Sequence, residues 1–123
     1  KESVICIINV DHRANLAALS RSEAIGDQEA QIESLVDQGF VVRQVIIDSK
    51  ASRYIEGIEH VAQPFTLVMS VSRKIAFLHH GIMADDLTRF AKYIRDGGER
   101  PGGEPFIQLI DANLHTDQCG MKL

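Results

Sequence analysis

The sequence predicts a three-layer α/β domain, with a mixed sheet of about four to five strands and helices on both faces. Short apolar runs rich in β-branched residues alternate with longer segments whose apolar residues recur at helical spacing. Two further apolar runs then follow each other directly, which is typical of an antiparallel hairpin. The predicted order of elements is therefore β-α-β-α-β-β-α.

The first strand and the helix after it have clear signals. Val4 to Ile8 is an almost unbroken β-branched run, which is typical of a strand buried on both faces. Residues 9–22 are expected to form a loop with two helical turns. Asp27 is a good N-cap for the next helix, whose apolar stripe includes Ile32 and Leu35. Gly39 should end that helix, because glycine readily adopts the left-handed cap conformation.

The second half of the chain alternates in the same way. A second strand is expected over Phe40 to Ile47, and a helix between Asp48 and Pro64 that Gly57 weakens. The runs Thr66 to Val71 and Lys74 to His80 form the predicted hairpin. The helix with the strongest pattern spans Leu87 to Ile94, where apolar residues recur at i, i+3, i+4 and i+7.

The domain is expected to span residues 1–95. Residues 96–105 are rich in glycine and proline and should form a linker or loop. In the tail, 106–123, Phe106, Leu109, Ile110 and Leu114 fall at helical spacing. We expect a short helix that packs back on the core, or one that docks in a partner's groove. Because the chain opens at Lys1 and not at Met, we expect it to belong to a larger protein or assembly.

Composition favours an intracellular domain, in the cytoplasm or nucleus. Of 123 residues, 45% are hydrophobic and 24% charged, which is ordinary for one globular core. No run of about 18 apolar residues suggests a membrane span. The two cysteines, Cys6 and Cys119, are too few and too far apart to indicate a disulfide framework. We expect Cys6, inside an apolar strand, to be a small buried hydrophobic residue.

Charge suggests where a polyanion could bind. The net charge is −4, and the first long helix is strongly acidic, which would repel a phosphate backbone. Basic residues fall in the hairpin and along the last helix, and the two groups could share one surface for RNA or for an acidic protein. The residues of this predicted basic patch are Arg73, Lys74, Arg89 and Lys92.

The best-placed polar cluster is Asp11 with His12, just past the first strand, where open α/β sheets usually bind ligands. His79 and His80 should point to opposite faces of their strand, so they cannot readily chelate one ion. The loop from Asp11 to Ser22 contains no cysteine, which argues against redox chemistry. We therefore predict no metal, no cofactor and no catalytic residue.

These features resemble the anticodon-binding domain of class II aminoacyl-tRNA synthetases and its relative in a nuclear receptor coactivator. The resemblance rests on the strand Val4 to Ile8, the helix ending at Gln38-Gly39, the strand to Asp48, and the run Gln63 to Ser70. Val71-Ser72-Arg73 departs from the glycine and acidic residue that synthetases commonly carry there.

A second resemblance is to the thioredoxin-like fold. It makes Pro64 the cis-proline, Thr66 to His80 the antiparallel hairpin, Gly81 its terminating glycine, and Leu87 to Ile94 the last helix. The redox cysteines of that fold are absent.

Both resemblances imply a non-catalytic binding module. We expect a protein partner, with RNA as an alternative and self-association through a sheet edge or the tail as a further one. A redox-inactive thioredoxin-like domain would act as a scaffold or as a chaperone-like interaction domain. An enzyme that uses Asp11, His12 and a neighbouring histidine is the remaining hypothesis.

Overall fold

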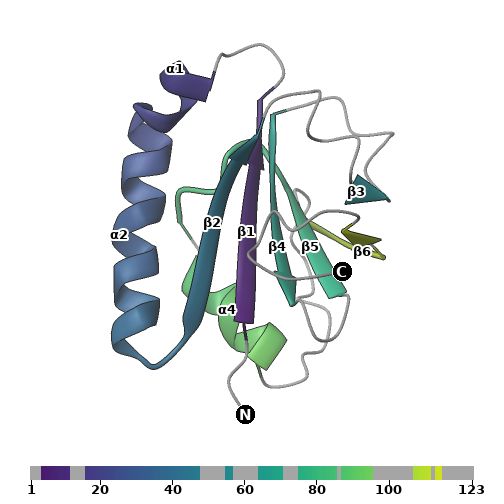
Figure 1. Ribbon diagram of the computed structural model, residues 1–123. Coiled ribbons are helices and arrows are strands. Elements are labelled where there is room, and N and C mark those ends of the chain that lie inside the picture. The colour runs from purple at the N-terminus through teal and green to yellow at the C-terminus, as the bar shows by residue number, and fades with distance from the viewer. Residues whose placement is uncertain are drawn as a thin grey trace.

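The computed structural model describes residues 4–11, 16–47, 55–56, 64–70, 75–85, 87–95, 107–111 and 113–114. It confirms an α/β fold built on a mixed sheet (Figure 1). The sheet has the strand order β2-β1-β4-β5-β6. Its strands are β1 (Val4–Val10), β2 (Val41–Ile47), β4 (Phe65–Ser70), β5 (Ile75–His80) and β6 (Ile107–Asp111).

Strand direction divides the sheet into two parts. β1 and β2 pair in parallel over their full lengths. β4 runs antiparallel to β1, and β4, β5 and β6 continue as antiparallel neighbours. The predicted hairpin is thus present as β4 and β5. A separate two-stranded sheet joins β3 (Ile55–Glu56) to β7 (Asn113–Leu114).

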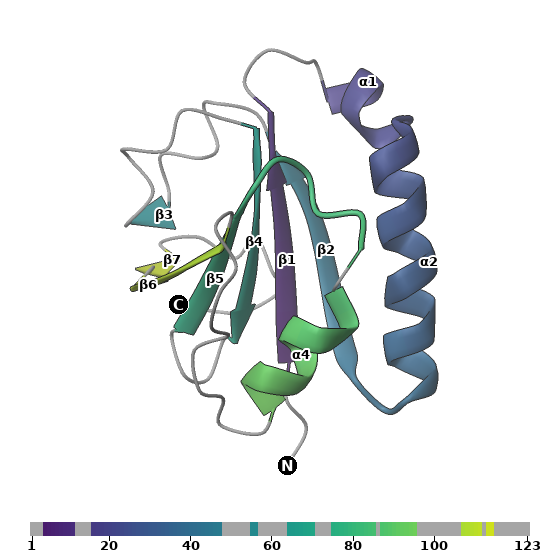
Figure 2. The same cartoon turned by 180° about the vertical axis from the view of Figure 1, so that it is seen from behind.

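Helices α2 (Glu23–Asp37) and α4 (Leu87–Arg95) contact each other and lie on the same face of the sheet (Figures 1 and 2). The sequence predicted helices on both faces, whereas these two helices cover the same face. The short helix α1 (Leu16–Ser20) contacts α2 and β2. Among the described helices, none combines the length and the apolar character that a membrane span requires.

The local signals explain why α2 begins and ends where it does. Its N-cap is Ser22, whose side-chain oxygen accepts a hydrogen bond from the Ile25 N–H at 3.3 Å. The predicted cap, Asp27, therefore lies inside the helix. At the other end Gly39 has φ +95°, and the Phe40 N–H bonds to the Leu35 carbonyl at 3.0 Å. This is a Schellman motif, so the predicted stop at Gly39 is correct.

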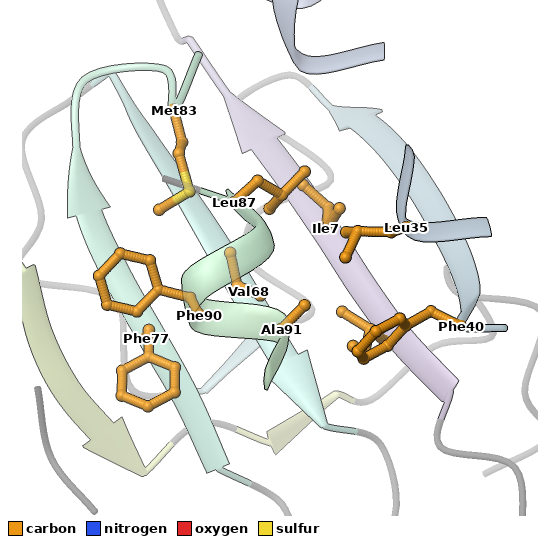
Figure 3. Packing of buried hydrophobic residues seen from close by; sticks show 10 residues of the cluster. Ile7, Leu35, Phe40, Val68, Phe77, Met83, Leu87, Phe90 and Ala91 are labelled. Carbon is orange, nitrogen blue, oxygen red and sulfur yellow. The ribbon is translucent and has the colours of Figure 1, made fainter. Parts of the chain in front are cut away.

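The core under α2 and α4 is apolar and fully buried. Ile7 on β1, Val68 on β4 and Phe77 on β5 meet Leu35 and Phe90 from the two helices (Figure 3). The Phe77 and Phe90 ring centroids lie 5.4 Å apart, within the range of favourable aromatic pairs. The periodic stripe of α4 is thus the face that packs on the sheet, as predicted.

The opposite face of the sheet is buried as well. Side chains there alternate with those of the core just described, as the pleat of each strand requires. Each is at most 2% exposed, so parts of the chain other than α2 and α4 cover them. They are Cys6, Ile8, Leu67, Met69 and Leu78.

Two predicted helices are wrong where the structure describes them. Ile55 and Glu56 form strand β3, inside the segment from Asp48 to Pro64 that was predicted to be helical. Residues 107–111 form strand β6 at the sheet edge and not a helix. The rest of the first segment, and residues 96–106 and 115–123, lie outside the described residues.

Candidate functional site

One end of the sheet holds Asp11 and His79, two of the polar residues that the sequence singled out. β1 and β2 both finish there, because Val10 pairs with Ile47, and β4 starts there, because Val10 also pairs with Phe65. We call this end, with the residues that border it, the sheet end. Asp11 follows β1 and is half-buried, while Pro64 precedes β4 and is half-buried too. It is the end of the parallel strands at which open α/β sheets usually bind ligands.

A polar row crosses the sheet just inside this end. Asn9, Thr66 and His79 are register partners on β1, β4 and β5. They lie two residues along from Ile7, Val68 and Phe77 respectively, so all three share the face that α2 and α4 cover. Asn9 and Thr66 are completely buried.

Asn9 forms a reciprocal amide pair with Gln28, which is also fully buried. The Asn9 Nδ2 donates to Gln28 Oε1 at 2.8 Å, and Gln28 Nε2 donates to Asn9 Oδ1 at the same distance. Asn9 Nδ2 also donates to the Val45 carbonyl at 3.2 Å. Gln44 Nε2, on β2, donates to Gln28 Oε1 at 2.9 Å. The pair thereby joins α2 to both parallel strands.

The same cluster holds the segment between β5 and α4. Thr66 Oγ1 donates to Asn9 Oδ1 at 2.8 Å and accepts from the Met83 N–H at 2.9 Å. Gln28 Nε2 donates to the Met83 carbonyl at 2.8 Å. One turn further along α2, Gln31 accepts from the Leu87 N–H at 2.9 Å and donates to the Ala84 carbonyl.

This buried cluster, Asn9-Gln28-Thr66, is saturated. Each amide nitrogen uses both of its hydrogens, each amide oxygen accepts twice, and the Thr66 hydroxyl both donates and accepts. Amides and hydroxyls of this kind do not titrate near neutral pH. The cluster therefore stabilises the fold. It offers a ligand neither an acid–base group nor a polar atom with unused hydrogen-bonding capacity.

This cluster was not among the predicted sites, although the sequence contains a signal for it. Gln28 occupies the apolar stripe of α2, between Ile25 and Ile32, where a hydrophobic residue is the default. Asn9 likewise interrupts the apolar run from Val4 to Val10. A polar residue at a core position needs a partner, and two such residues on neighbouring elements are candidates to pair.

The two histidines have separate surroundings. The half-buried His79 has its Nδ1 at 2.9 Å from the Gly81 carbonyl, and since a carbonyl only accepts, Nδ1 carries the proton. His80 is exposed. β4 lies between β5 and β1, so His79 is about 10 Å from β1, at about 4.8 Å per strand.

Within the described part of the chain, no three His, Cys, Asp or Glu side chains approach closely enough to hold a metal ion.

The structure describes little of the predicted basic patch. Arg89 is exposed on α4, with its guanidinium carbon 5.0 Å from the centroid of the Phe90 ring. Lys92 belongs to α4, but its side chain lies outside the described residues, as do Arg73, Lys74 and the predicted site residue His12. The patch stays a prediction.

Cys6 differs from its predicted role. It is completely buried, as expected, but it is disulfide-bonded. The prediction that it is merely a small hydrophobic residue is therefore wrong.

Comparison with known proteins finds no match: no family model, no curated protein and no solved structure is similar to this chain.

Proposed function

We propose that this chain is a non-catalytic binding domain of thioredoxin-like architecture, and that it contacts a protein partner at the sheet end. The saturated Asn9-Gln28-Thr66 cluster carries the proposal. The cluster lies next to the carboxyl ends of the parallel strands, where α/β domains usually bind their ligands, and it makes this end of the sheet rigid.

Contacts at the start of β4 support the thioredoxin-like resemblance over the anticodon-binding one. That resemblance assigns special roles to Pro64 and Gly81, which are far apart in sequence. Here the Gly81 N–H donates to the Pro64 carbonyl at 2.7 Å, and Gly81 has φ +86° directly after β5. The hairpin β4–β5 followed by α4 also fits the order that the resemblance implies.

Charge favours a protein over RNA. Helix α2 has acidic side chains along its exposed side and contains no Lys or Arg. It lies against α4, which carries the exposed Arg89. An RNA strand reaching Arg89 would come close to this negative surface, which opposes polyanion binding. The exposed acidic residues are Glu23, Asp27, Glu29, Glu33 and Asp37.

The proposal is tested by asking whether a protein partner depends on the sheet end. The natural chain is cross-linked in cells of its source and compared with the double variant Asp11→Asn, His80→Ala. His80 belongs to the sheet end because it is the last residue of β5, and the preceding His79 pairs with Thr66 near the start of β4. Gln38→Ala is the matched control, because Gln38 is exposed at the opposite end of the sheet, beside the start of β2. We expect a specific protein to be recovered with the natural chain and the control, and at least tenfold less with the double variant.

A parallel measurement addresses RNA and self-association. Titration of single-stranded RNA, followed by fluorescence anisotropy at two salt concentrations, should show no salt-dependent binding. Sedimentation of the same sample reports whether the recovered partner is a second copy. RNA affinity that falls steeply with salt, together with protein recovery that is equal for all variants, would overturn the proposal.

A further inference from the structure

Cys6 has surroundings that restrict how its disulfide can form. It lies in the middle of β1, opposite Arg43 on β2 and Met69 on β4, and it is 0% exposed. Its side chain points to the sheet face opposite α2 and α4. A cysteine of another molecule would have to enter this packed interior to reach it. The bond is therefore expected within one chain.

Counting the cysteines identifies the partner. The chain contains two, Cys6 and Cys119, and Cys6 is disulfide-bonded. We propose that Cys6 and Cys119 form an intramolecular disulfide, which links β1 covalently to the C-terminal part of the chain. The sheet face to which Cys6 points is buried although α2 and α4 lie on the other side.

The chemistry requires an oxidant. Two thiols of this chain lose two protons and two electrons as the sulfur–sulfur bond forms. A disulfide-bearing oxidase accepts them by thiol–disulfide exchange, through a mixed disulfide, and leaves with two thiols. Because Cys6 is buried in the folded protein, the exchange precedes its burial. The Cys119 thiolate attacks the oxidase disulfide and forms the mixed disulfide, and the Cys6 thiolate then attacks the Cys119 sulfur and releases the second oxidase thiol.

The compartment follows from this bond. Structural disulfides form and persist in oxidising surroundings, such as the periplasm, the endoplasmic reticulum lumen or the cell exterior. The expected intracellular, reducing location rested on Cys6 being a plain buried residue. The disulfide instead assigns the maturation of this chain to an oxidising compartment. This inference is independent of the proposed partner at the sheet end.

Mass spectrometry tests the inference on the natural chain. The protein is exported to an oxidising compartment, purified without reductant, denatured and treated with N-ethylmaleimide. We expect no adduct before reduction and two after it. Trypsin cleaves after Lys1, Arg13, Arg95 and Lys122, so the unreduced digest should contain residues 2–13 linked to residues 96–122.

A variant adds a second readout. In Cys119→Ser, Cys6 should resist N-ethylmaleimide in the native protein and gain one adduct after denaturation, because the thiol stays buried. Two adducts on the unreduced natural chain, or a mass equal to a disulfide-linked dimer, would refute the intramolecular bond. Should the variant fail to fold, the linked peptide of the natural chain still decides the question.

Discussion

Asn9 is the residue that holds the most elements together. Its side chain reaches α2 through Gln28, β2 through the Val45 carbonyl and β4 through Thr66. Gln28 and Thr66 are completely buried, so their polar groups cannot turn to water when Asn9 is lost. A hydrogen bond of this kind adds little net free energy to the folded state, but leaving one buried partner unsatisfied is strongly destabilising.

Replacing Asn9 with alanine should therefore be severely destabilising. The variant leaves both polar ends of Gln28 short of a partner and removes an acceptor from Thr66. At about 1–3 kcal/mol for each buried group left unsatisfied, we expect a loss of about 3 kcal/mol or more in the free energy of unfolding. Urea unfolding measures it. Gln38→Ala, at an exposed position at the C-terminal end of α2, is the control and should change stability by less than about 0.5 kcal/mol.

A double-mutant cycle tests whether Asn9 and Gln28 act as one unit. Gln28→Ala alone should lower the free energy of unfolding about as much as Asn9→Ala, because each variant leaves the other buried amide without its partner. The double variant should then lose clearly less than the sum of the two, by about 1–3 kcal/mol. Simple additivity of the two losses would show that the reciprocal pair is not the source of the effect.

At the level of single residues, the sequence was informative about positions and poor about partners. It placed Asp11 just past the end of β1, whereas Gln28 inside the apolar stripe of α2 was a signal that led to no prediction. It could not show that Gln28 faces Asn9, because that contact joins elements 19 residues apart in the chain. The disulfide of Cys6 escaped for the same reason: sequence separation alone says nothing about spatial proximity.

Among the elements, α2 offers a comparison between two glycines, one inside the helix and one just past its C-terminal end. Gly39 has φ +95° in the Schellman motif, whereas Gly26 lies in the helix and is exposed. A Cβ atom at either position would meet no atom within 4 Å, so the backbone conformation alone decides the outcome.

The same substitution should thus have opposite effects at the two glycines. Gly39→Ala forces alanine into the left-handed region and should destabilise the protein by about 1–2 kcal/mol. Gly26→Ala removes conformational freedom from the unfolded chain and should stabilise it by about 1 kcal/mol. Thermal unfolding of the two variants measures both. Equal and same-signed shifts in the melting temperature would contradict this account of the cap.

Elements with strong periodicity were predictable, and short apolar runs were not. The stripe of α4 matched its packing face because Leu87, Phe90 and Ala91 recur at helical spacing and meet the sheet. In the tail, Leu109 and Ile110 fit that spacing too, yet they belong to β6, which pairs with β5. Pairing with a sheet edge that is already formed outweighs weak local preference over so few residues.

For the whole molecule, fold class followed from the order of elements, while the covering of the sheet did not. The alternation of strands and helices sufficed to predict an α/β fold with a mixed sheet. Which helix covers which face depends on crossovers that local patterns do not encode. α2 and α4 share one face, and the opposite face is buried without them. The proposed disulfide between β1 and the C-terminal part of the chain has a measurable consequence for global stability.

Reduction of the natural chain should lower its free energy of unfolding by about 3–5 kcal/mol, because the proposed bond between Cys6 and Cys119 closes a loop of roughly 100 residues in the unfolded state. The urea m value should rise at the same time, since a reduced unfolded chain expands and exposes more surface. The double variant Cys6→Ala, Cys119→Ala should behave like the reduced protein and be insensitive to reductant. If reductant leaves both the midpoint and the m value of the natural chain unchanged, the bond does not constrain the unfolded state.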